Sequence, residues 1–231
     1  MALFKPGPAA SAISGKTGGT VFSHNRGGQY MRQFVVPTNP ASPQQQAVRT
    51  ILSGNVNYWN NLLTAAQRAA WDTYALNTPI TNRLGDPINV GGLGMYNRAN
   101  VPALQASLSR IDDAPTIYNT GEMDETLVAT VDEATDKFDL AFDDTLDWCD
   151  EDGSALLIYA SRPQNASINF FKGPYRFAHA IEGDSTTPPT SPENGIDLPF
   201  PVASGNRVFF RARIVRADGR VSDDFRFFDD A

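Results

Sequence analysis

The 231-residue sequence predicts an α+β fold in which a mixed N-terminal part precedes a β-sandwich. Apolar residues recur at helical spacing between residues 42 and 75, whereas short β-type runs alternate with turns from Ile117 onward. The charge divides at the same place. Residues 1–114 hold nine Lys and Arg against four Asp and Glu, and residues 115–231 hold ten against twenty-two. This asymmetry indicates two domains with different surroundings.

Residues 1–18 are predicted to form an extended arm. Proline, glycine and small side chains dominate this segment, which cannot bury enough apolar area to order itself. We therefore expect a neighbouring chain to hold the arm in place.

Within the arm, Ala10–Thr17 matches a relaxed Walker A pattern, A-x-x-x-x-G-K-T. A phosphate-binding loop needs a buried strand before it and a helix after it. Pro6 and Pro8 exclude a central strand, and the following GGTVFS favours an extended strand over a helix. No nucleotide binding is expected.

Residues 19–114 are predicted to contain a β-hairpin followed by helices. Two β-rich runs within residues 19–36 flank NRGG, a turn with glycines where positive φ is needed. Ser42 then begins a helix with Pro43 at its first position and Gln45 completing a capping box. Thr64 and Gln67 form a second box, so a helical hairpin bends near residues 63–65.

The helical part should have its own aromatic core. Trp59 and Trp71 lie at helical spacing among apolar residues, and such aromatic stripes usually pack inside. A third helical segment near residues 94–108 is broken at Pro102. Residues 109–116 form the linker to the next domain.

Residues 115–231 are predicted to form an antiparallel β-sandwich of about seven short strands. The terminal run RVFFRARIVRADGRVS resembles the last hairpin of fibronectin type III domains, with Asp218-Gly219 as its turn. This resemblance implies an immunoglobulin- or fibronectin III-like sandwich. Its inner face would be supplied by Val208, Phe210, Ala212, Ile214 and Val215.

The acidic stretch 122–152 holds thirteen Asp and Glu against one lysine, Lys137. Its segment DDTLDWCDEDG suggests a calcium loop, but positions one and twelve of an EF-hand would be Trp148 and Tyr159, which cannot serve. A solvated acidic edge that discourages aggregation is the favoured interpretation. A divalent site between loops stays open, and no metal site is predicted.

No catalytic motif stands out. One cysteine, Cys149, excludes an internal disulfide, and with only His24 and His179 it cannot build a structural zinc site. Neighbouring acids should raise the pKa of the Cys149 thiol and keep it unreactive. Nothing resembles a positioned-serine motif. We expect a protein that is not an enzyme and has no cofactor.

Composition limits the partners. The N-terminus lacks an apolar signal region, and no window approaches a membrane-spanning length, so a soluble chain is expected. The acidic C-terminal half argues against nucleic acid as a partner. The single RGG at residues 26–28 lacks the repetition of RNA-binding segments.

The N-terminal half resembles small, largely uncharacterised proteins of tailed bacteriophages and prophages that are associated with the virion. The resemblance covers about residues 14–100 and rests on SGKxGGTVFSxNRGGxYxR, PxNP with a following glutamine, and W-x-x-x-L-T-x-x-Q-R-x-x-W. It implies a virion protein made in the bacterial host cytoplasm, and it brings no reaction and no catalytic residues.

The predicted function is therefore that of a structural subunit, a decoration or minor capsid protein that clamps its neighbours with the N-terminal arm. Its partners would be major capsid or tail subunits and further copies of itself. A tail or head–tail connector component is an alternative, as is a glycan-binding module using Trp148, Tyr159, Phe170 and Phe171. The predicted assembly interface comprises Leu3, Phe4, Ile13, Lys16, Arg26, Tyr30 and Arg32.

Overall fold

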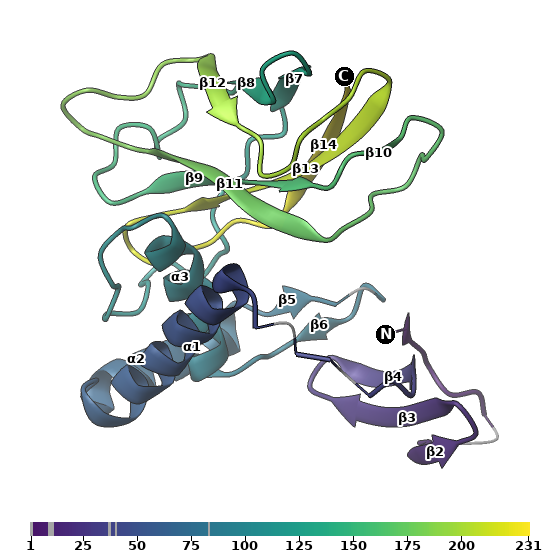
Figure 1. Ribbon diagram of the computed structural model, residues 1–231. Coiled ribbons are helices and arrows are strands. Elements are labelled where there is room, and N and C mark those ends of the chain that lie inside the picture. The colour runs from purple at the N-terminus through teal and green to yellow at the C-terminus, as the bar shows by residue number, and fades with distance from the viewer. Residues whose placement is uncertain (1, 9–11, 37, 40, 83) are drawn as a thin grey trace. The chain divides into compact units, whose positions relative to one another are not determined.

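The computed structural model describes residues 2–8, 12–36, 38–39, 41–82 and 84–231. It confirms the α+β class, with helices and a small sheet preceding a C-terminal sandwich (Figure 1). The chain divides into two compact units, Met1–Tyr96 and Asn97–Ala231. The division falls within a helix, and the linker expected at residues 109–116 lies inside the second unit. Whether an independently folding fragment begins at that linker stays a prediction.

The first unit opens with a four-stranded antiparallel sheet. Its strands are β1 (Ala2–Leu3), β2 (Gly15–Thr17), β3 (Thr20–Asn25) and β4 (Gly28–Gln33), in the order β1-β4-β3-β2. Asn25 pairs with Gly28 across a two-residue turn, and Gly28 takes φ +110°, which glycine adopts without strain. The predicted hairpin is thus present.

Both ends of the predicted arm pair with this hairpin, and residues 9–11 between them lie outside the described part of the chain. Leu3 pairs with Tyr30 on one edge, and Lys16 pairs with Val21 on the other. The arm's own strands thus occupy both edges of the hairpin, so pairing within the chain holds the ends of the arm where a neighbouring chain was expected to hold them.

The helices begin where the capping residues predict. Ser42 Oγ accepts the Gln45 N–H at 3.4 Å and starts α1 (Pro43–Asn61). Thr64 and Gln67 exchange both bonds of a capping box at the start of α2 (Ala65–Asn77). A small hairpin, β5 (Ile80–Thr81) and β6 (Pro87–Ile88), leads to α3 (Gly92–Gln105), which contains Pro102.

The first unit has a small aromatic core. Trp71 is fully buried, with its ring centroid 5.6 Å from that of Tyr96 and 6.0 Å from that of Tyr74. Trp59 lies 5.5 Å from Tyr96 but is only half-buried. The core prediction therefore holds fully for Trp71 and partly for Trp59.

The second unit is a sandwich of two antiparallel sheets. One sheet has the order β12-β8-β7, and the other has the order β10-β13-β9-β11 with β14 paired to β13. The strands are β7 (Val128–Asp132), β8 (Lys137–Ala141), β9 (Ala155–Ser161), β10 (Gln164–Asn165), β11 (Tyr175–Glu182), β12 (Glu193–Asp197), β13 (Asn206–Val215) and β14 (Phe225–Asp230). An apolar core lies between the sheets and includes Leu140, Leu156, Ile158 and Phe210.

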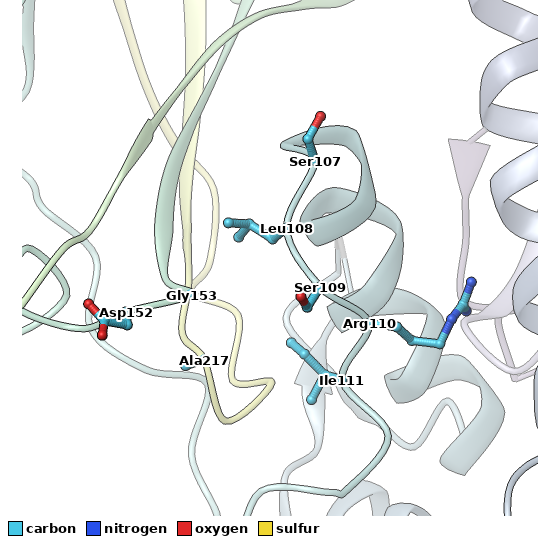
Figure 2. Close-up of a pocket in the computed structure, with 8 residues that line it drawn as sticks. All are labelled: Ser107, Leu108, Ser109, Arg110, Ile111, Asp152, Gly153 and Ala217. Atoms are coloured by element: carbon cyan, nitrogen blue, oxygen red, sulfur yellow. The ribbon is translucent and has the colours of Figure 1, made fainter.

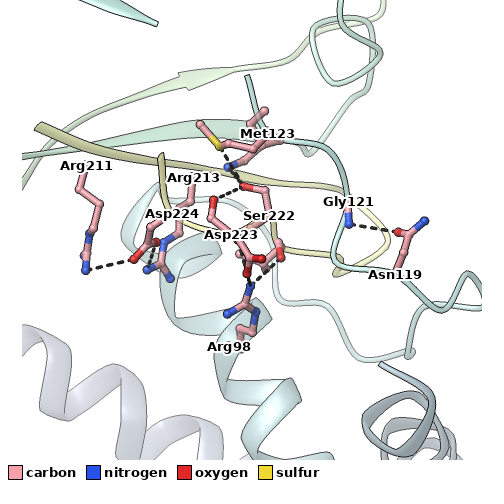
Figure 3. Close-up of polar contacts among 11 residues, drawn as sticks. Arg98, Asn119, Gly121, Met123, Arg211, Arg213, Ser222, Asp223 and Asp224 are labelled. Carbon is pink, nitrogen blue, oxygen red and sulfur yellow. Dashed lines mark hydrogen bonds and ion pairs between the residues drawn. The ribbon is translucent and has the colours of Figure 1, made fainter. Parts of the chain in front are cut away.

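Strand β13 matches four of the five residues predicted for the inner face, because Val208, Phe210, Ala212 and Ile214 belong to this core. Val215 is buried but does not belong to it. Gly219 takes φ +94° in the predicted turn. The outward arginines are engaged within the chain: Arg207 pairs with Asp230 and Arg213 with Asp224, each at 2.6 Å. Figure 3 shows Arg211 and Arg213 converging on Asp224, so this face is occupied by its own ion pairs.

Candidate assembly surface

The N-terminal sheet has no buried core of its own. Of the residues from 3 to 54 whose burial the structure describes, none is fully buried, and the first buried residue is Asn55. In the sandwich, by contrast, every residue of β9 is buried. A sheet needs a covered apolar face to be stable by itself. The described residues of the N-terminal sheet therefore lack a covering layer.

The pairing register gathers predicted interface residues on one face of this sheet. Leu3 lies opposite Tyr30, and Lys16 lies opposite Val21, which itself lies opposite Arg32. Residues directly opposite one another project to the same side of a sheet. We call this side the cationic face, and it includes Leu3, Lys16, Val21, Ser23, Tyr30, Arg32 and Phe34.

A cation–π contact extends the cationic face beyond β4. The Lys16 Nζ lies 3.7 Å from the centroid of the Phe34 ring, and the Phe34 N–H donates to the Gly19 carbonyl at 2.7 Å. Lys16 and Arg32 are exposed, and the Phe34 side chain is 46% exposed. The face therefore presents positive charge beside apolar and aromatic surface.

The other predicted interface residues lie elsewhere. The Phe4 ring packs edge-to-face on Phe22 at 6.1 Å, and its N–H donates to the Gln29 carbonyl at 3.0 Å. Ile13 is exposed and donates its N–H to the Gln29 side chain at 3.2 Å. The Arg26 side chain, in the β3–β4 turn, donates a hydrogen bond to the Val90 carbonyl. Phe4 and Arg26 thus make contacts inside the first unit, and the cationic face does not include them.

A second apolar surface was not foreseen. Val48, Leu52 and Val56 recur every four residues on α1 and are 38%, 45% and 37% exposed. Val35 and Val36, before the helix, are also exposed. Helical periodicity identifies an apolar stripe but cannot tell whether another element covers it. The stripe on α1 therefore adds to the uncovered surface of the first unit.

The last three residues of the Walker-like pattern are arranged as a strand, and its first two, Ala10 and Ser11, lie outside the described residues. Gly15–Thr17 form β2, and a turn at Gly18 and Gly19 leads directly into β3. A phosphate-binding loop would instead lead into the N-terminus of a helix. The local geometry at Lys16 is therefore that of a sheet edge.

A pocket of about 480 Å³ lies in the second unit (Figure 2). It is lined by Ser107–Ile111 and by Asp152, Gly153 and Ala217. Asp152 Oδ1 accepts the Ser185 N–H at 2.7 Å, and the Arg110 side chain points away from Asp152 in Figure 2. No nucleophile–base pair is assembled among these lining residues. The predicted absence of catalysis and cofactors stays a prediction.

The acidic stretch and Cys149 have structural roles where the chain is described. Asp124 Oδ1 accepts the Thr126 N–H at 2.7 Å, and its Oδ2 accepts the Asp143 N–H at 2.8 Å. Burial, followed by the nearby carboxylates, raises the pKa of Cys149 to about 12. In the described part of the chain, no three His, Cys, Asp or Glu side chains gather as a metal-ligand set.

The four aromatic residues considered for glycan binding divide into two pairs. Trp148 and Tyr159 are buried, so they cannot grip a saccharide. Phe170 and Phe171 are 60% and 44% exposed, with Phe171 packed edge-to-face on Phe209. An adhesion site would have to rely on the second pair.

No helix in the described ranges has the length and apolar character needed to cross a bilayer. Comparison with protein families, characterised proteins and solved structures finds nothing similar to the chain. Function must therefore be argued from the sequence resemblance and from the surfaces described above.

Proposed function

We propose that this protein is a non-enzymatic structural subunit of a tailed-bacteriophage virion, made in the host cytoplasm and built into the particle. Within the virion it would be a capsid-associated protein, a decoration or minor capsid subunit. Its N-terminal sheet would clamp a neighbouring subunit. The observation that carries this proposal is an N-terminal sheet in which no residue of described burial is buried, together with the cationic face on one of its sides.

The physical argument concerns what covers the sheet. An ordered strand has lost about 1–2 kcal/mol of backbone entropy per residue. Apolar burial of about 25 cal/mol per Å² normally offsets this cost, and the N-terminal sheet has little such burial. A partner placed on the sheet would supply the missing burial. A sheet that clamps a neighbouring subunit would be covered by that subunit in this way.

Exposed apolar side chains support the same location. Among the described residues, seventeen large apolar side chains are exposed, and eleven of them lie in the first unit, which has fewer than half of the residues. Such a concentration is typical of a surface that binds another protein. The virion assignment itself is supported by the resemblance of residues 14–100 to phage proteins.

The test has two parts. Mass spectrometry of purified particles from a phage or induced prophage carrying this gene should find the protein. The double variant Lys16→Glu/Arg32→Glu, on the cationic face, should be lost from particles. Arg49→Glu/Lys172→Glu changes the net charge equally at exposed positions off that face and should incorporate normally. Absence of the wild-type protein from particles would refute the proposal.

A protein in the tail or the head–tail connector would also be found by mass spectrometry of whole particles. Fractionation of heads from tails therefore distinguishes that position from the capsid position. A glycan-binding role has a specific observation in its favour, the exposed Phe170 and Phe171. Loss of particle adsorption to host cells in Phe170→Ala/Phe171→Ala, with normal incorporation, would support that second role.

A further inference from the structure

Charge is segregated along the chain more sharply than the totals indicate. Residues 1–71 contain six Lys and Arg and no Asp or Glu. The first unit has two carboxylates, and both are engaged: Asp86 pairs with Lys5 at 2.6 Å, and Asp72 accepts the Gly92 N–H at 2.9 Å. Neither carboxylate belongs to the cationic face, so Lys16 and Arg32 have no acidic residue on their own sheet.

The sandwich offers a face of opposite charge. In the β12-β8-β7 sheet, Phe138 and Leu140 point into the core, while Thr130 lies opposite Asp139 and Asp132 lies opposite Lys137, which pairs with Asp197. We call the outward side the acidic face. It comprises Val128, Thr130, Asp132, Lys137, Asp139, Ala141 and Asp197.

The acidic face carries three carboxylates and one ammonium group. The Lys137 Nζ lies 3.4 Å from Asp197, which partly neutralises that lysine. The Thr135 hydroxyl and then the Ala134 N–H lower the pKa of Asp132 and keep it ionised. Val128 adds an apolar side chain that is 58% exposed. The face thus mirrors the cationic face, with apolar groups among charges of the opposite sign.

We infer that the cationic face of one copy docks on the acidic face of a second copy. This inference rests on the proposed function and names a partner for the clamp. Both surfaces are faces of antiparallel sheets, and their charges are complementary. The two faces belong to different units, so the contact is head-to-tail. A docked pair still offers one free cationic face and one free acidic face, and head-to-tail contacts of this kind build closed rings or open filaments.

The contact is small. Four strands spaced about 4.8 Å apart, of which the two central ones have six residues rising about 3.3 Å each, give a face of at most roughly 19 by 20 Å. Interfaces of this size belong to the weak class. Dilute protein should therefore be largely monomeric, and association should grow with concentration and fall with salt, because exposed charges are screened.

The experiment is sedimentation velocity over a concentration series at low and high salt, using the full chain. Wild type should self-associate at low salt. Lys16→Glu/Arg32→Glu should not, since it makes both faces acidic. Asp139→Lys/Asp197→Lys should not, since it makes both faces basic; the Asp132 turn is left intact. A mixture of the two variants should regain association, because the acidic faces of one variant can then dock on the basic faces of the other.

Controls separate charge from folding and from other partners. Arg49→Glu/Lys172→Glu and Glu122→Lys/Glu125→Lys match the charge changes at exposed positions and should associate as wild type does. If Asp139→Lys/Asp197→Lys fails to fold, the milder variant Asp139→Asn/Asp197→Asn takes its place, and this variant should weaken association.

Absence of wild-type self-association, or failure of the mixture to restore it, overturns the second copy as occupant. If the cationic-face variant is nonetheless lost from particles, the proposed function stands and the face binds another virion protein. A salt-dependent change in the monomer's sedimentation coefficient that is independent of protein concentration would show docking within one chain and would also overturn the inference. Binding of the wild type to a DNA duplex, lost in the cationic-face variant, would assign the face to nucleic acid instead.

Discussion

The N-terminal sheet and the C-terminal sandwich are both built from antiparallel strands, yet their side chains meet different surroundings. Every residue of β9 is buried, whereas β3 and β4 contain no buried residue. Strand propensity and turn chemistry therefore specify the N-terminal sheet, but they do not supply a core. Regular secondary structure and a covered face are therefore separate properties, and the uncovered sheet is the surface for which we propose a partner.

The largest effect that sharpens this comparison is expected in the sandwich core. Phe210 is fully buried, with its ring centroid 4.9 Å from Phe138 and 5.3 Å from Phe227. Phe210→Ala should lower the free energy of unfolding by about 3–5 kcal/mol. The matched change Phe22→Ala, in the half-buried N-terminal sheet, should cost at most about 1 kcal/mol. Urea unfolding measures both, and equal costs would contradict the comparison.

A similar difference is expected between the two tryptophans of the helical part. Trp71 is fully buried, and Trp71→Ala should cost about 3–5 kcal/mol. Trp59 is half-buried, so Trp59→Ala should cost less. Thermal unfolding followed by circular dichroism measures the order, and a Trp59 variant that is the less stable of the two would show that the core is centred elsewhere.

The Cys149 thiol reports on the protection of the sandwich. Its pKa is raised from 9.0 to about 12 by burial and nearby acids. As pH rises above 9, the unfolded thiol ionises first, so this group favours unfolding progressively between pH 9 and 12. The stability of wild type should therefore fall more steeply than that of Cys149→Ala in this range. Parallel pH profiles would mean that the thiol is not protected.

A smaller effect is expected on the α1 stripe. Leu52 is 45% exposed, and Leu52→Ser should change the free energy of unfolding by no more than about 0.5–1 kcal/mol. Incorporation into particles should fall if the stripe is covered by a neighbour. A large loss of stability in the isolated protein would show instead that the stripe belongs to the chain's own core.

The smallest effect is the one expected for nucleotides. Lys16 lies in β2 beside Phe34, without a following helix. Isothermal titration with magnesium and ATP should give no heat. Saturable heat that disappears in Lys16→Met would overturn the rejection of the Walker-like pattern.

Local signals in the sequence predicted the elements whose cause is local. Ser42 and Thr64 mark helix starts through their own hydrogen bonds, and the Asp218-Gly219 turn follows from residue type. The alternation in β13 predicted which side chains enter the core.

Long-range partners could not be predicted in this way. Nothing local in Leu3 or Lys16 indicates that their strands pair with β4 and β3. The sequence around the outward arginines of β13 likewise did not indicate that they would form ion pairs with Asp224 and Asp230. The cationic face results from this pairing register. Four of its residues were therefore predicted to lie in the interface, but the sequence could not show that they share one face of a sheet.

Hydrogen exchange followed by mass spectrometry, on the free protein and on assembled particles, measures whether a neighbour covers the N-terminal sheet. Amides of β3 and β4 should exchange quickly in the free chain and become protected in particles, while β9 and β13 stay protected in both states. If β3 and β4 are as protected as β9 in the free protein, or gain no protection on assembly, the N-terminal sheet is not the surface that a neighbour covers.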